Sequence, residues 1–282
     1  MMRYKLFFLF FVTSIFCCQS GDEKYIRDLQ ISYRDISAGY FGADQKLFLV
    51  HSSCKEFPKE IVVFVHGSPG SWRDYKKFIL DETLRNKYCL VTLDRPGFGN
   101  SMVDMSMPDI EKQADLIYEA MQDFRRQFSK LKEGTVFVGH SYGGPIIASI
   151  AKTRSSKFDQ FIFISSPIDP SLEEIRWYNR IASYSLIRFL LSKEMNHSNE
   201  EMMPLREQLS GLVKDWKSQA KQFIVLHGDH DMLVPIENVK FFKNLLILGN
   251  KLTKTIVIED ENHFIPWTQH DLVVKSIMEL EN

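Results

Sequence analysis

The chain has 282 residues, 44% of them hydrophobic, and its 35 basic and 36 acidic residues leave a net charge of −1. Sequence of this length and composition can bury one large hydrophobic core, so a single α/β domain is a reasonable expectation. The chain lacks the excess of Lys and Arg that nucleic-acid-binding surfaces need, which disfavours that class of function.

The first twenty residues have the order of a secretory signal. Arg3 and Lys5 make the start basic, residues 6–18 are uncharged and mostly apolar, and the sequence turns polar from residue 19. An apolar run this short does not readily span a bilayer. We therefore expect residues 1–20 to be a signal peptide, and the mature protein to be exported to the cell envelope, the periplasm or the medium.

Two ways of processing this signal stay open. In a bacterium, residues 14–18 resemble a loose lipoprotein box in which Cys18, or less favourably Cys17, is lipidated. A lipid at Cys18 would attach the protein to a membrane. Small residues also allow ordinary cleavage before Gly21, which would release the protein without a lipid.

Beyond the signal, apolar runs of strand length alternate with helical patterns. The first two strands, expected at residues 31–36 and 46–51, predict an antiparallel pair at the sheet edge. Continuous apolar runs, typical of strands covered on both faces, follow at residues 61–65, 88–93, 136–138, 161–164 and 223–226, and a last strand is expected at residues 255–259. Helical patterns are present at residues 74–84, 108–128, 236–248 and 269–280. The alternation predicts an α/β fold, with a mostly parallel sheet flanked by helices.

Cys54 and Cys89 are the cysteines outside the signal. Cys89 lies in an expected buried strand, where we interpret it as a free thiol that packs as a small hydrophobe. Two cysteines at unrelated positions do not indicate a disulfide framework, although their pairing stays open.

The regular alternation stops between residues 165 and 221. The sequence from Ser171 to Glu174 has the spacing of a capping box and predicts the start of a helix rich in large apolar side chains. A second helix is expected near Pro204, because proline is favoured in a first helical turn. This insert follows the sixth expected strand.

The segment Gly139-His140-Ser141-Tyr142-Gly143 stands between an expected strand and a helical pattern. Gly-x-Ser-x-Gly is typical of a sharp turn in which the backbone approaches itself and small residues are needed. Such a turn exposes the Ser141 hydroxyl beside the N-terminus of the following helix. The motif therefore makes Ser141 a candidate nucleophile.

Four segments together resemble the α/β-hydrolase family, in the family's order, from about residue 31 to the C-terminus. They are His66-Gly67-Ser68-Pro69-Gly70, Asp94-Arg95-Pro96-Gly97-Phe98-Gly99-Asn100-Ser101, the Ser141 turn, and residues 228–235 followed by Asn262-His263-Phe264. The resemblance implies a core of residues 25–164 and 221–282, with residues 165–220 as a short helical cap. It also implies that cap aromatics contact the substrate, and the candidates are Trp177, Tyr178, Tyr184 and Phe189.

A serine nucleophile needs a base to accept its proton and an acid to orient that base. His263 follows the last expected strand directly, at the carboxyl end of the sheet, and is the expected base. The resemblance selects Asp231 as the acid, with Asp169 as the alternative and Asp229 as a residue that braces the loop. No cofactor or metal is expected, because adjacent residues rarely converge on one ion.

Stabilising the negatively charged oxygen of a tetrahedral intermediate needs two backbone donors. The resemblance implies that these are the N–H groups of Ser68 and Tyr142. Arg95 is interpreted as scaffolding of its loop.

The resemblance implies a serine hydrolase that cleaves an ester, thioester or amide of a small acyl substrate, most simply a carboxylesterase or lipase-like enzyme. An iminopeptidase is an alternative, although such enzymes usually have Trp where this chain has Tyr142. A non-catalytic binding lipoprotein of the cell envelope is another. Dehalogenases and most epoxide hydrolases are disfavoured, because they carry Asp in place of Ser141.

Overall fold

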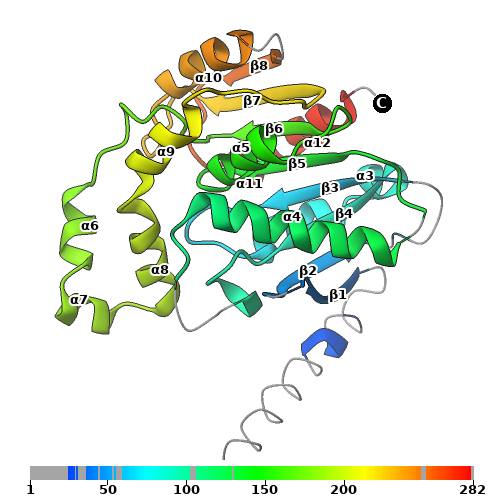
Figure 1. Ribbon diagram of the computed structural model, residues 1–282, viewed down its shortest axis with the longest axis horizontal. Helices are drawn as coiled ribbons and strands as arrows, with labels where there is room; N and C mark the ends of the chain where they lie inside the picture. The colour runs from blue at the N-terminus through cyan, green and yellow to red at the C-terminus, as the bar shows by residue number, and fades with distance from the viewer. Residues whose placement is uncertain are drawn as a thin grey trace, which may run out of the picture.

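The computed structural model describes residues 25–28, 30, 36–43, 45–52, 54, 59–101, 106–128, 130–248 and 252–280. Eight strands form one sheet in the order β1-β2-β4-β3-β5-β6-β7-β8, and helices cover both of its faces (Figure 1). Strands β1 and β2 are antiparallel, and every pair from β4 to β8 is parallel. The predicted α/β fold with a mostly parallel sheet is confirmed. The strands are β1 (Ile36–Phe41), β2 (Leu47–Ser52), β3 (Glu60–Val65), β4 (Tyr88–Leu93), β5 (Thr135–His140), β6 (Gln160–Ile164), β7 (Gln222–Gly228) and β8 (Leu252–Ile258).

The central strands read as continuous apolar runs because both of their faces are buried. In β3, Ile61 and Val63 pack with α4 (Ile110–Gln127) and α5 (Gly143–Thr153). The intervening Val62 and Phe64 point to the other face, since successive side chains of a strand alternate. The second face is covered by η1 (Trp72–Tyr75), α2 (Lys76–Ile79), α3 (Glu82–Lys87), α11 (Ile265–Thr268) and α12 (His270–Met278). The remaining core helix is α10 (Glu237–Leu248), and η2 (Gly99–Ser101) lies in the loop after β4.

Two boundaries differ from the sequence prediction. Strand β1 begins at Ile36, where the expected first strand ends, and residues 31–35 lie outside the described residues. The helix expected at residues 74–84 is divided into η1, α2 and α3. A new helix starts because Asp81 has extended backbone and its carboxylate accepts a hydrogen bond from the N–H of Leu84.

Four helices lie between β6 and β7, in the segment expected to form the cap: α6 (Trp177–Ala182), α7 (Ser185–Leu190), α8 (Lys193–Met202) and α9 (Leu205–Val213). The prediction that a helix starts at Ser171 is wrong. Its hydroxyl and N–H both donate to the Asp169 carboxylate, so the expected cap is not made. Helix α8 was not expected, because most of its side chains are polar; it begins where the Ser192 hydroxyl accepts from the N–H of Met195.

Cys54 and Cys89 form a disulfide, so the interpretation of Cys89 as a free thiol is wrong. The antiparallel pairing of β2 and β4, with His51 opposite Val91, explains the contact. Continuing this register past the end of β2 puts Cys54 within one position of the point opposite Cys89, and the two Cα atoms lie 4.9 Å apart. The bond closes a loop with a sequence separation of 35 residues.

We expect the Cys54→Ala/Cys89→Ala double variant to lose about 2–4 kcal/mol of unfolding free energy, because the unfolded chain regains the freedom of the closed loop. Urea denaturation under non-reducing conditions measures this loss. Reductant should lower the stability of the wild-type protein to that of the variant and leave the variant unchanged. Equal stability of the two oxidised proteins would contradict a stabilising role.

The expected signal peptide, including Cys18, lies outside the described residues, so export and lipid attachment stay predictions. In the part of the chain that the structure describes, no helix combines the length and the hydropathy needed to cross a membrane.

Candidate active site

Ser141 occupies the turn between β5 and α5, at the carboxyl edge of the sheet. Its φ of 52° lies in the left-handed region, which residues other than glycine rarely adopt. The turn is held against β6, because the N–H of Ser141 donates to the carbonyl of Ile164 at 2.9 Å. A Cβ at Gly143 would clash with the carbonyl oxygen of Val65, which is why the motif needs glycine there. The strained turn therefore presents the Ser141 hydroxyl at a fixed place.

His263 lies in the loop between β8 and α11, and its Nδ1 is 2.7 Å from Oδ2 of Asp231. A carboxylate can only accept, so Nδ1 carries the proton and Nε2 is left free to accept one. The other carboxylate oxygen, Oδ1, accepts from the N–H groups of Leu233 and Val234, each at 2.9 Å. These three contacts fix the acid and the orientation of the imidazole.

Burial by itself would raise the pKa of the Asp231 carboxyl. The hydrogen bond and charge of His263, helped by the two N–H donors, outweigh burial and lower this pKa below its usual value. Asp231 is therefore ionised at neutral pH. A buried negative charge beside His263 would stabilise an imidazolium formed during a reaction.

The other acidic candidates lie elsewhere. Asp169 accepts hydrogen bonds from Ser171, and its N–H donates to Oδ1 of Asn238. Asp229 lies 3.4 Å from the exposed ring of His230. Among the described residues, no three His, Cys, Asp or Glu side chains are grouped so that they could hold a metal ion.

The loop that contains Gly67 and Ser68 lies against the candidate nucleophile. A Cβ built on Gly67 would be 3.0 Å from Cβ of Ser141. The carbonyl of Gly67 faces away from the site and accepts from Nη2 of Arg95 at 2.8 Å and from the His66 ring at 2.8 Å. In a trans peptide the N–H points opposite to the C=O, so the N–H of Ser68 is directed to the other side.

The His66 ring is neutral and its tautomer is set by its neighbours. Its Nε2 accepts the backbone N–H of Arg95 at 3.0 Å, which leaves the proton on Nδ1 for the carbonyl of Gly67. Burial and the nearby Arg95 charge both hold the pKa of His66 well below its usual value. His66 therefore supports the loop and does not serve as a base.

A buried ion pair connects this loop to the cap. The guanidinium of Arg95 pairs with the carboxylate of Glu201 on α8, with distances of 2.6 Å and 3.0 Å, and both side chains are almost fully buried. Glu201 also accepts from the Ser68 hydroxyl and, at 2.8 Å, from Nε2 of Gln113. Arg95 lies over the ring of Tyr142, 5.0 Å from its centre. One guanidinium thus contacts both segments that carry the expected oxyanion donors.

Sequence reasoning assigned Arg95 to loop scaffolding and did not single out Glu201. Helix α8 reads as a solvated helix, and nothing in its composition distinguishes Glu201 from the neighbouring Glu200. The one usable signal was the four-residue spacing of His197 and Glu201, which puts them on one face of a helix. The structure shows that both are buried.

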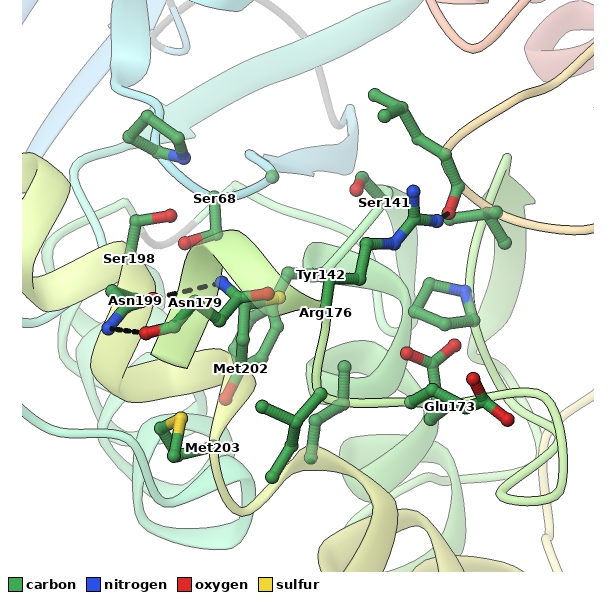
Figure 2. A pocket seen from close by; sticks show the side chains of 18 of the residues that line it. Ser68, Ser141, Tyr142, Glu173, Arg176, Asn179, Ser198, Asn199, Met202 and Met203 are labelled. Atoms are coloured by element: carbon green, nitrogen blue, oxygen red, sulfur yellow. Dashed lines mark hydrogen bonds between the residues drawn. The ribbon is translucent and has the colours of Figure 1, made fainter. Parts of the chain in front are cut away.

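Core and cap border an open cavity of about 1310 Å³. Ser141, Tyr142, Ser68 and His263 line it from the core. On the cap side, Figure 2 shows Asn179 and Asn199 joined by hydrogen bonds, near Met202. Ser141, His263 and the cap therefore all face one cavity.

The expected set of cap aromatics needs a correction. Tyr178 lines the cavity, but Trp177, Tyr184 and Phe189 are not among its lining residues and are largely exposed. Trp177 on α6 and Leu186, Phe189 and Leu190 on α7 point outward, and none of the residues of α7 is buried. The apolar side chains that do line the cavity from the cap side include Ile175, Leu191, Met195, Met202 and Met203.

Comparisons with known proteins agree on the fold. A family model described as "alpha/beta hydrolase fold" matches residues 60–189. Protein ABHD8 of Mus musculus and of Homo sapiens are each 26% identical to this chain over 230 residues, covering 70% of this chain and 51% of each relative. The chain therefore spans about half the length of the curated relatives that it matches.

Similar solved structures come from several enzymes. The epoxide hydrolase CorEH has a TM-score of 0.66 and 14% identity, covering 87% of this chain and 98% of the other. The Pyrococcus furiosus esterase Pf2001 has a TM-score of 0.62 and 16% identity, covering 86% and 88%. A membrane phospholipase A, described as a bacterial virulence factor, has a TM-score of 0.59 and 14% identity, covering 99% and 100%. At these identities the likeness concerns the fold alone.

Proposed function

We propose that this chain, which has the α/β-hydrolase fold, is a serine hydrolase that cleaves carboxylic esters through an acyl-enzyme. The observation that carries the proposal is the 2.7 Å contact between His263 and a buried Asp231, in a loop that lines the same cavity as Ser141. Ser141 in turn stands at a strained turn that exposes its hydroxyl. Nucleophile, base and acid are the three roles that acyl transfer needs.

In the proposed reaction the Ser141 hydroxyl attacks the carbonyl carbon of the ester, and Nε2 of His263 takes its proton. Asp231 stabilises the imidazolium, which then protonates the leaving alcohol. Water, activated by the same imidazole, releases the acid from Ser141. The N–H groups of Ser68 and Tyr142 would stabilise the oxyanion, an effect worth several kcal/mol when the donors are fixed in advance.

His140 is the neighbouring imidazole that could compete for the role of base. Its Nε2 contacts the carbonyl of His263 at 2.9 Å, and it is buried. Burial, with a smaller effect of His263, lowers the pKa of His140 to about 3. The ring therefore stays neutral and donates to the His263 carbonyl, which supports the base loop.

The test of the function is labelling by a fluorophosphonate, which reacts with an activated serine. We expect the purified protein to be labelled and the Ser141→Ala protein to remain unlabelled. Prior heat denaturation should abolish labelling, since activation needs the folded site. A folded protein that resists labelling would favour the alternative of a binding protein on the same fold.

The size and lining of the cavity suggest an apolar acyl group of moderate length. We expect kcat/KM for nitrophenyl esters to rise from acetate upward and then to fall, because each buried methylene contributes about 0.8 kcal/mol until the cavity is full. Tyr178→Asn should flatten the rise, whereas Tyr184→Asn, a change of the same kind outside the cavity, should not. A profile highest at acetate in all three proteins would show that the cavity does not select the acyl chain.

A further inference from the structure

The outer surface of α6 and α7 carries large apolar side chains that nothing in the described structure covers. Phe189 is 85% exposed, Leu186 73%, Trp177 and Leu190 72%, and Tyr184 68%. We call these five residues the cap-tip patch. Single exposed apolar residues are ordinary on protein surfaces, but five within fourteen positions are not. Figure 1 shows that α6 and α7 lie at the end of the cap remote from the sheet.

The segment that carries the cap-tip patch has charges of one sign. Residues 175–193 contain Arg176, Arg180, Arg188 and Lys193 and no Asp or Glu, in a chain whose net charge is −1. All four side chains are exposed. Arg188 pairs with Glu200, and Arg176 donates to the carbonyl of Leu233 at 2.9 Å. The positive charge is therefore confined to the segment that carries the apolar side chains, since Glu173, Glu174 and Glu194 adjoin it.

Tryptophan, tyrosine, phenylalanine and leucine among basic residues are the composition of segments that lie in the interface of a membrane. The apolar rings enter the headgroup region, while Arg and Lys attract anionic lipids. A second copy of the chain would bring the same positive charges together, which disfavours it as the occupant. We propose that the cap-tip patch docks on the surface of an anionic lipid bilayer.

Docking in this orientation would bring the cavity close to the lipid. Arg180 and Leu191 lie in the same segment, residues 175–193, and line the cavity, so the segment that carries the patch also forms part of the cavity wall. A lipid ester could then pass from the bilayer to Ser141 without crossing water. This consequence rests on the proposed function, whereas docking itself does not need hydrolysis.

Co-sedimentation with vesicles tests the proposal, with every protein carrying Ser141→Ala so that lipid is not consumed. One vesicle is phosphatidylcholine, and the other is an equimolar mixture with phosphatidylglycerol. We expect binding to the anionic vesicle to fall about tenfold or more in Phe189→Ser/Leu190→Ser. Arg180→Gln should lower it about fivefold on anionic vesicles only. Phe158→Ser, which changes an exposed aromatic outside the cap, should have no effect.

A local readout separates this surface from the apolar N-terminal sequence, which is the same in all variants. Brominated lipid should quench the emission of Trp177, seen as the difference between the protein and its Trp177→Phe variant. Unchanged sedimentation of the double variant, or absence of quenching at Trp177, would overturn the proposal. So would a concentration-dependent dimer that the double variant abolishes, because the patch would then bind a second copy. Fluorophosphonate labelling is measured on the protein that keeps Ser141, so its result does not depend on these three outcomes.

Discussion

Ser141→Ala and His263→Ala are each expected to lower kcat for ester hydrolysis by about 10⁴-fold or more, because each removes a role that water does not fill. The double variant should lose little more than either single variant, since the two residues act as one unit. Burst and steady-state kinetics with a nitrophenyl ester measure both losses. Circular dichroism should show that each variant stays folded.

Alanine variants at three aspartates with different contacts test which residue is the acid. Asp231→Ala should cost at least 10³-fold in kcat, because the 2.7 Å contact that sets the tautomer of His263 is lost. Asp229→Ala and Asp169→Ala are matched controls and should keep most of the activity. A large loss in Asp169→Ala combined with near-normal Asp231→Ala would reassign the acid.

Glu201→Ala is expected to lower the unfolding free energy by about 3–5 kcal/mol, because it leaves the Arg95 guanidinium buried without a counter-charge. It should also lower kcat by about 10²-fold, since the Gly67–Ser68 peptide and the Tyr142 ring both rest on that guanidinium. Chemical denaturation and ester hydrolysis measure the two effects separately. Glu200→Ala on the same helix breaks a more exposed pair and should cost about 1 kcal/mol or less.

A second variant separates positioning from stability. In Arg95→Met/Glu201→Met the buried charges are replaced by apolar side chains, which should restore most of the lost stability. Activity should stay low, because the carbonyl of Gly67 loses the Arg95 donor and keeps only the His66 ring. Recovery of activity together with stability would mean that the ion pair only supports the fold.

The sheet could be predicted because its signals are local. Strand β3 has apolar side chains on both faces, and this pattern can be recognised from its own sequence without knowing which strands it pairs with. The turn at Ser141 is local in part, since a Cβ at Gly139 would meet Gly143 of the same turn, whereas Gly143 is required by the close approach of strand β3. The positions of Asp231 and His263 after consecutive strands follow from the parallel order of β7 and β8.

The features that sequence reasoning missed depend on contacts between distant segments. Cys54 meets Cys89 only because β2 runs antiparallel to β4, and neither residue reports that register. Glu201 and Glu200 are adjacent and identical in type, yet one is buried against Arg95 and the other pairs with Arg188 near the surface. Likewise, the sequence does not show that Phe189 points outward, because a buried apolar helix and an exposed one can have the same composition.

The Arg95–Glu201 pair also bears on how caps are exchanged between enzymes of this fold. Arg95 belongs to the core, and Glu201 arrives with the cap. A chimera that received a foreign cap without a carboxylate at this place would bury an unpaired cation beneath the candidate active site. Such a graft would fail for an electrostatic reason, even with well-chosen junctions. A stable chimera would have to keep residues 95 and 201 together as a pair.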